Sequence, residues 1–211
     1  HNLIPYLDLG MMPLSNALMS SADEIAPRYP LKVCLCERCG LSQLSIVIDP
    51  ETLFGHYVYR SSIAQGYKDH CKDMAIMLAD PQGYYAFPED SFHVDIAGND
   101  GALLAEFKKV FGKEYKTLNV DPAENLAKIC EDQGIRTFTT FWGIKAAEHL
   151  IATHWPKADL ITATNVFAHV DDVAEFLQAA KMVLSDAGVL VLEFPYLIDF
   201  IEKNEFDTVY F

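Results

Sequence analysis

Two kinds of apolar pattern alternate along the chain from about residue 91 onward. Short runs rich in β-branched and aromatic residues are typical of strands, and segments of about 10–15 residues with apolar positions every three or four are typical of helices. Strands that alternate with such helices form right-handed βαβ units and a parallel sheet. The pattern predicts a doubly wound α/β domain with five strands, at 92–97, 115–120, 135–140, 159–164 and 189–194.

Helices are expected between these strands. Gly112 and Gly134 end two of them, because glycine readily takes the left-handed conformation that closes a helix. The run at 189–194 contains so many apolar residues that we expect this strand to be buried on both faces. The predicted helices cover 101–111, 123–132, 144–153 and a segment that begins at Asp171 or Asp172 and reaches Leu184.

The first 60 residues show a different pattern. They contain five prolines, which interrupt regular structure, and two short apolar runs at 31–36 and 41–48 that flank a turn at 37–40. This pattern predicts a small β-rich module. The expected domains are therefore the module at 1–60, a helical connector at 61–88 and a Rossmann-like domain at 89–211.

Composition and charge exclude several classes of function. The 211 residues are 51% apolar, and the charge sum is 16 − 30 = −14. So acidic a chain repels nucleic-acid backbones and anionic membranes, and no stretch approaches the length of about 18 apolar residues that a membrane helix needs. Five cysteines, an odd number, do not suggest a disulfide framework, so we expect a cytoplasmic protein.

The loop after the first strand of the predicted sheet carries the first candidate site. It reads Asp-Ile-Ala-Gly-Asn-Asp-Gly at 95–101, with two glycines where a dinucleotide fingerprint needs three. Asp100 would repel a pyrophosphate but attract an ammonium or sulfonium group. The loop therefore favours a ligand with cationic groups, and its candidate binding residues are Asp95, Gly98, Asn99, Asp100 and Gly101.

The second strand ends at a second candidate, Asp121. It follows Gly98 by 121 − 98 = 23 residues, close to the offset of about 20 at which an acidic residue accepts hydrogen bonds from ribose hydroxyls. A nucleoside with a cationic tail and no phosphate describes S-adenosylmethionine. The alternative that Asp121 only begins a turn before a helix remains open, because Asp-Pro is common in such turns.

Further candidates follow the third and fourth strands. Phe141 and Trp142 could stack on an adenine ring or could belong to the core. Asn165 is a further candidate for cofactor binding at the end of the fourth strand. His169 follows it over the same crevice, where an imidazole could move a proton.

Cys36 and Cys39 form a Cys-x-x-Cys turn, which is one half of a structural zinc site. The chain has no second such pair. Cys34 could in principle act as a ligand, whereas Cys71 and Cys130 lie in predicted helices and are expected in the core. The sequence therefore shows only half of a zinc ligand set.

Long motifs in a fixed order link the chain to a known family. They include Asp-Ile-Ala-Gly-Asn-Asp-Gly at 95–101 and Asn-Val-Phe-Ala-His-Val-Asp-Asp at 165–172. The chain resembles the sugar C-methyltransferases that act on 4-keto deoxysugar nucleotides, typically at C-3. The other motifs that carry the resemblance are at 7–16, 29–31, 36–44, 49–62, 119–125, 193–196 and 205–210.

The resemblance implies an N-terminal zinc module, an S-adenosylmethionine-binding Rossmann-like domain and a further C-terminal domain. It also implies a nucleotide-sugar substrate. His169, Tyr210 and a tyrosine of the 57–59 segment would line the substrate site, and we choose Tyr59 over Tyr57 as that tyrosine. His169 would transfer a proton or stabilise an enolate. The zinc would be structural.

Two family motifs are interrupted at the ends of the chain. The family carries a Cys-x-x-Cys before the segment at 7–10 and a His-Glu-His after Tyr210, where this chain has Phe211. We therefore expect a piece of a longer protein. The alternatives are an O- or N-methyltransferase or a catalytically incomplete module that binds S-adenosylmethionine. An NAD-dependent oxidoreductase is disfavoured by Asp100 and the missing third glycine.

Overall fold

The computed structural model describes residues 2–55, 57–80, 82–83, 87, 90–206 and 209. The chain forms two compact units, one of residues 1–58 with 196–211 and one of residues 59–195. This division differs from the expected domains in two places. Helix α2 (Gln65–Ala79), in the expected connector, belongs to the second unit because it packs on α3 (Ala102–Phe111). Residues 196–211, expected in the Rossmann-like domain, group with the first unit.

The first unit contains an antiparallel sheet in the order β1-β2-β3. Its first strand was not predicted, because Pro5 and Pro13 lie in it. The structure accommodates them since β1 is an edge strand whose pairing is irregular after Pro5, and prolines are tolerated at such places. The strands are β1 (Leu3–Pro13), β2 (Arg28–Cys36) and β3 (Ser42–Leu44), and the unit also contains helices α1 (Pro50–Phe54) and α7 (Leu197–Lys203).

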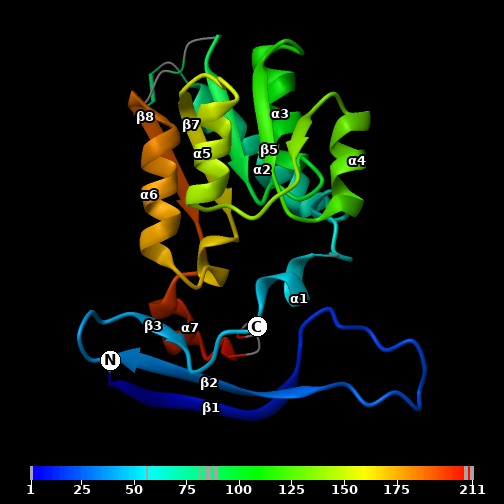
Figure 1. The fold of residues 1–211 in the computed structure, drawn as a ribbon, viewed down its shortest axis with the longest axis vertical. Helices are drawn as coiled ribbons and strands as arrows, with labels where there is room; N and C mark the ends of the chain where they lie inside the picture. The colour runs from blue at the N-terminus through cyan, green and yellow to red at the C-terminus, as the bar shows by residue number, and fades with distance from the viewer. Residues whose placement is uncertain are drawn as a thin grey trace. The chain divides into compact units, whose positions relative to one another are not determined.

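The second unit contains a five-stranded sheet in the order β6-β5-β4-β7-β8, in which every strand pairs in parallel (Figure 1). The predicted α/β class and the five parallel strands are confirmed. The strands are β4 (Phe92–Ile96), β5 (Lys116–Val120), β6 (Arg136–Phe138), β7 (Ala158–Thr164) and β8 (Leu184–Glu193).

Helices cover both faces of this sheet (Figure 1). Helices α5 (Ile144–Ala152) and α6 (Val173–Val183) pack on one face, against Val94, Ile96 and Ile161. On the other face, α2 and α3 enclose a second cluster with Leu160, and α4 (Glu124–Asp132) packs on the first turn of α3 through Cys130 and Leu104. As expected, Cys71 and Cys130 are buried.

Strand β8 corrects one expectation. The sequence predicted that 189–194 is buried on both faces, but its strand residues are only half-buried. The physical reason is its position: β8 lies at an edge of the described sheet and pairs with β7 alone. The apolar run therefore reflects partial burial on each face.

The strand order reverses between β4 and β7. The chain proceeds from β4 outward through β5 to β6 and then returns to the other side of β4 as β7. Ligands of doubly wound sheets bind at such a reversal, beyond the carboxyl ends of the strands. Within the residues described, no helix combines the length and the apolarity that a membrane crossing requires.

Candidate functional site

The loop at 97–101, which follows β4, has an unusual backbone. Ala97, Asn99 and Gly101 have φ values of 53°, 54° and 79°, in the left-handed region. This conformation brings Gly98 against the strand below, where a Cβ atom would lie 2.4 Å from Oδ2 of Asp95. Only glycine permits that approach, so Gly98 is required for the tight turn that was predicted here, and its contact with a ligand stays a prediction.

The backbone N–H groups of this loop all have acceptors within the protein. The side chains of Asn119 and Asp121, at the end of β5, accept hydrogen bonds from the two central N–H groups of the loop. The donors and acceptors are Ala97 N to Val120 O (2.7 Å), Gly98 N to Asn119 Oδ1 (3.1 Å), Asn99 N to Asp121 Oδ2 (2.9 Å), Asp100 N to Asn99 Oδ1 (2.9 Å) and Gly101 N to Gly98 O (2.9 Å). A pyrophosphate bound in the manner of a dinucleotide needs free N–H groups at this place, and the loop offers none.

Three carboxyl groups lie in and beneath the loop. Asp95 and Asp100 are fully buried and Asp121 is 5% exposed. Burial, and then the charge of nearby Asp100, raise the pKa of Asp121 above its usual value. This concentration of acidic groups disfavours an anion and favours a ligand that carries an ammonium or sulfonium group.

Asp95 belongs to a buried polar chain across β4 and β7. Thr162 Oγ1 donates to Asp95 Oδ1 at 2.6 Å, and Thr162 also contacts Nε2 of His93 at 2.8 Å. Since the hydroxyl has one proton, it accepts from Nε2–H of His93. Asp95 Oδ2 and His93 Nδ1 have no partner among the described residues. Burial, and then the charge of Asp121, raise the pKa of Asp95 to about 7, and burial lowers the pKa of His93 to about 3.

We expect Asp95→Asn to change how stability depends on pH. The raised pKa means that the folded protein keeps a proton that the unfolded chain releases between about pH 4 and 7. The contribution of Asp95 to stability is therefore lost as the pH rises through this range. The measured quantity is the free energy of unfolding of Asp95→Asn minus that of the parent. This difference should rise by more than about 1 kcal/mol between pH 4 and 7.5.

Urea denaturation at a series of pH values measures this difference. Asp132→Asn is the matched control, because this side chain is 70% exposed and pairs with Lys128 only at 3.7 Å. The control should show the same difference from the parent at every pH. A difference that is equally flat for Asp95→Asn would contradict the assignment.

Asp121 accepts two backbone hydrogen bonds, one at each carboxylate oxygen. Asn99 N donates to Oδ2 and Ala123 N donates to Oδ1, both at 2.9 Å. Each oxygen keeps a further lone pair, which a ribose hydroxyl could use. Asp121 also begins the turn before α4, so the two functions that the sequence left as alternatives are compatible in one residue.

The carboxylate of Asp100 contacts other residues of the protein, where a cationic ligand was expected. Ser62 Oγ donates to its Oδ2 at 2.6 Å, Ser62 N donates to the same oxygen at 3.1 Å, and Arg60 Nε lies 3.7 Å away. These contacts bury the carboxylate and compensate part of its charge. Asp100 therefore anchors the segment at 59–62 to the cofactor loop, and the expectation that its carboxylate faces a cationic ligand does not fit these contacts.

The same anchor positions Tyr59. Its carbonyl oxygen accepts from Asn99 Nδ2 at 3.2 Å, and Ser61 N donates to Asn99 Oδ1 at 3.0 Å. The Tyr59 side chain is 46% exposed. The segment thus lies against the loop at 97–101, whereas Tyr57 belongs to the other compact unit.

The aromatic pair after β6 has two different environments. Trp142 packs against the core, and its Nε1 donates to the carbonyl of Phe176 at 3.2 Å. Phe141 is 36% exposed. The structure thus places Trp142 in the core, and Phe141 remains the candidate for contact with an adenine.

Asn165 and His169 follow β7, beside β4. Asn165 has a φ of 56° and donates through its backbone N–H to Glu193 O at 2.8 Å. His169 lies in a short 3-10 helix (Phe167–His169) and is half-buried. Burial lowers its pKa, so its imidazole is neutral at neutral pH and can accept a proton. Tyr210 lies outside the described residues.

Several polar residues near the ends of β7 and β8 were not predicted from the sequence. Tyr67 and His70 lie three residues apart on α2, a spacing that places both on one helix face. Tyr67 contacts Thr164 Oγ1 through its hydroxyl at 3.1 Å, and His70 Nε2 contacts Glu193 Oε2 at 2.6 Å. The spacing could have indicated them, but their partners could be found only after the fold was known.

Cys36 is the last residue of β2, and Cys39 lies in the turn that leads to β3. Hydrogen bonds from the backbone N–H groups of Cys39 and Arg38, and one from the Cys39 side chain, lower the pKa of Cys36. Such N–H donors also suit a metal-bound thiolate. The two cysteines thus fit half of a zinc site. Among the described residues, no group of three or more His, Cys, Asp or Glu side chains is arranged to hold a metal ion.

Two family models match separate parts of the chain. Residues 1–54 match the family described as "Putative zinc binding domain", and residues 94–190 match the family described as "Methyltransferase domain". The second match covers the loop at 97–101, Asp121 and His169.

The chain is similar to a curated protein and to a solved structure. The chain is 31% identical to C-methyltransferase NovU of Streptomyces niveus over 97% of its own length and 47% of that protein, so it spans about half of this relative. A solved plantazolicin methyltransferase, BpumL, superposes with a TM-score of 0.51 at 16% identity, covering 68% of this chain and 52% of that one. The second likeness shows a shared fold.

Proposed function

We propose that the chain is the zinc-module and cofactor-binding part of a C-methyltransferase that uses S-adenosylmethionine. Its substrate would be a small molecule, a 4-keto deoxysugar nucleotide, methylated on the carbon next to the ketone, typically C-3. The proposal is supported by the relative named as a C-methyltransferase and by the motifs shared with the sugar C-methyltransferases.

One observation carries the choice of cofactor. Every backbone N–H group of the loop at 97–101 is already bonded within the protein, and two acidic side chains besides Asp100, those of Asp95 and Asp121, lie beneath or beside that loop. A ligand that brings hydroxyl donors and positive charge suits this environment, whereas a pyrophosphate does not. The residues thus fit S-adenosylmethionine, which supplies an electrophilic methyl group when it is bound.

We assign cofactor binding to residues at four strand ends. Asp121 would accept the ribose hydroxyls with its remaining lone pairs, and Phe141 would contact the adenine ring. Asp95 would act from beneath the loop, against Gly98, and the side chain of Asn165 would contribute where the strand order reverses between β4 and β7. Gly98, Asn99 and Gly101 give the loop its shape, and Asp100 supports that shape through Ser62 and Arg60.

Carbon methylation requires a proton to leave the C–H group next to the ketone. We assign this proton transfer, or the stabilisation of the resulting enolate, to His169, whose lowered pKa keeps the imidazole neutral. Tyr59 would line the substrate side of the loop, together with Tyr210. The role of His169 predicts that activity falls as the pH drops through its pKa, because the protonated ring cannot accept a proton.

We expect His169→Asn, made in the full-length protein, to retain its affinity for S-adenosylhomocysteine within about twofold. It should exchange the substrate's α-proton with D2O at least about 100-fold more slowly, because the base is gone. NMR follows the exchange, and proton NMR of the product distinguishes methylation on carbon from methylation on oxygen or nitrogen.

His149→Asn is the matched control, since this histidine is exposed on α5 and stacks only on Phe138. It should exchange at the parental rate. Parental exchange in His169→Asn would remove the histidine from the proposal. Tight cofactor binding with no transfer to any ketosugar by the parent would instead favour a module without catalysis.

The proposal also includes a structural zinc ion held partly by Cys36 and Cys39, and a cytoplasmic location. The matched zinc-binding family and the N–H donors around Cys36 support the zinc. Elemental analysis of the full-length protein should find zinc that is lost in Cys36→Ser. Absence of zinc from the parent would contradict this part.

A further inference from the structure

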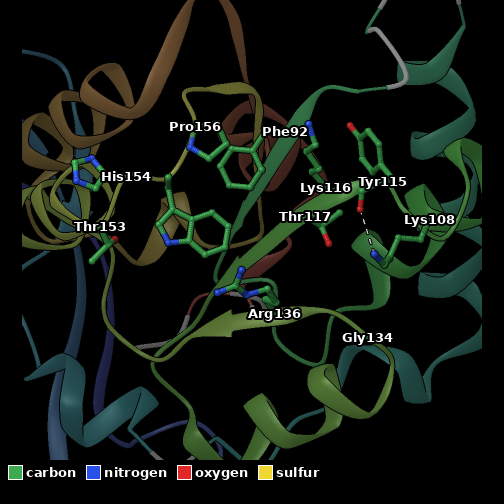
Figure 2. A pocket seen from close by; sticks show the side chains of 11 residues that line it. Phe92, Lys108, Tyr115, Lys116, Thr117, Gly134, Arg136, Thr153, His154 and Pro156 are labelled. Atoms are coloured by element: carbon green, nitrogen blue, oxygen red, sulfur yellow. Dashed lines mark hydrogen bonds between the residues drawn. The ribbon is translucent and has the colours of Figure 1, made fainter.

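We propose that residues 59–195 hold a second ligand site, which binds a small phosphate-bearing molecule at the edge of the sheet opposite to the cofactor loop. An open cavity of about 450 Å³ lies there, where β4, β5 and β6 begin (Figure 2). The loop at 97–101 follows the other end of β4, so the two sites do not overlap. This inference does not depend on the proposed methyl transfer.

The floor of the cavity is largely buried. Phe92, Tyr115 and Thr117 line it and are 3%, 2% and 7% exposed. The ring of Tyr115 stacks on Phe111 with the two centroids 4.7 Å apart, which holds this part of the floor in place.

The rim of the cavity is cationic. Lys108, Lys116 and Arg136 line it, together with His154, and no aspartate or glutamate does so although the chain has 30 acidic residues. Neither Lys116 nor Arg136 forms an ion pair with a described carboxylate. In a chain with a net charge of −14, this is an unusual local concentration of positive charge.

Arg136 is held in place by an aromatic ring. Its guanidinium lies over the ring of Trp155, 4.5 Å from the centroid, and Trp155 in turn stacks on Phe92 at 5.3 Å. A guanidinium fixed by its flat face keeps its N–H donors at the edge free. These donors match the oxygens of a phosphate, which arginine binds through paired hydrogen bonds.

Other charges near the cavity reduce its positive field but do not cancel it. Helices α3, α4 and α5 end at this edge, each with about half a negative charge, and Lys108 Nζ donates to the carbonyls of Lys113 and Tyr115. Asp159 accepts from Phe92 N at 3.0 Å. Three cationic side chains therefore exceed about two and a half negative charges, which leaves the site suited to an anion.

Inorganic pyrophosphate is the probe for this site. The chain has two tryptophans, so Trp142→Phe leaves Trp155, in the cavity, as the reporter. We expect saturable quenching or enhancement of Trp155 fluorescence by pyrophosphate, with binding confirmed by calorimetry. In the same background, Lys116→Gln with Arg136→Gln should weaken binding at least about tenfold.

Lys128→Gln is the matched control, because this exposed lysine on α4 removes the same charge away from the cavity. It should bind pyrophosphate as the parent does. If the double variant does not fold, Lys116→Gln alone should still weaken binding. Affinity within twofold of the parent in the Lys116 and Arg136 variants, or displacement of pyrophosphate by S-adenosylhomocysteine, would overturn the proposal.

Discussion

Gly98→Ala is expected to reduce the affinity for S-adenosylhomocysteine at least about 100-fold and to destabilise the fold by about 2 kcal/mol. A Cβ atom at position 98 would lie 2.4 Å from Asp95 Oδ2 and 2.6 Å from Asn119 Oδ1. Neither side chain can retreat easily. Both are fully buried, Asp95 is held by Thr162, and Asn119 bonds to the carbonyl of Asn99 at 3.2 Å. The loop must therefore move, and its contacts with β5 would be lost.

Calorimetry with S-adenosylhomocysteine and urea denaturation measure the two effects. Gly66→Ala is the matched control: a Cβ atom there meets nothing within 4 Å, and alanine is favoured over glycine within a helix. We expect Gly66→Ala to bind like the parent and to be equally or more stable. Parental binding by Gly98→Ala would show that the loop geometry does not form the cofactor site.

Asp100→Ala is expected to lower stability by about 3 kcal/mol and the melting temperature by about 6–10 °C. The change removes the acceptor that binds the N–H and hydroxyl of Ser62 and pairs with Arg60. The segment at 59–62 should separate from the cofactor loop. Hydrogen exchange at the amides of Ser61 and Ser62 should therefore become faster than in the parent.

Two further variants test whether the loss of stability comes from the buried contacts of Asp100. Asp100→Asn keeps one acceptor oxygen and should lie between the parent and Asp100→Ala. Asp132→Ala removes an exposed carboxylate and should change stability by less than about 0.5 kcal/mol. Equal stability of Asp100→Ala and Asp132→Ala would mean that the buried contacts of Asp100 do not hold the segment.

The fold of residues 59–195 could be predicted because the periodic pattern and the topology are local signals. The five strands and their helices follow from short apolar runs that alternate with amphipathic segments, and Gly112 and Gly134 occur where two helices end. Two features could not be predicted: that β1 forms a strand despite its prolines, and that β8 is only half-buried. Both depend on which strand lies at a sheet edge, which is settled by pairing between distant segments.

The candidate site was predictable in part for the same reason. Strand order alone brings the loop at 97–101 next to Asp121, and the structure joins them by a hydrogen bond from Asn99 N. The contacts of Asp100 could not be found in this way, because Ser62 precedes it by 38 residues and nothing in either segment indicates the pairing. Likewise, the contact between Thr162 and His93 could be found only once the register between β4 and β7 was known.

The most direct test is titration calorimetry of the purified protein with S-adenosylmethionine and, separately, with NAD. Because the loop has no free N–H donor and lies against the acidic side chains of Asp95 and Asp121, we predict saturable heat with the sulfonium compound and none with the dinucleotide. Saturable binding of NAD without binding of S-adenosylmethionine would contradict the account.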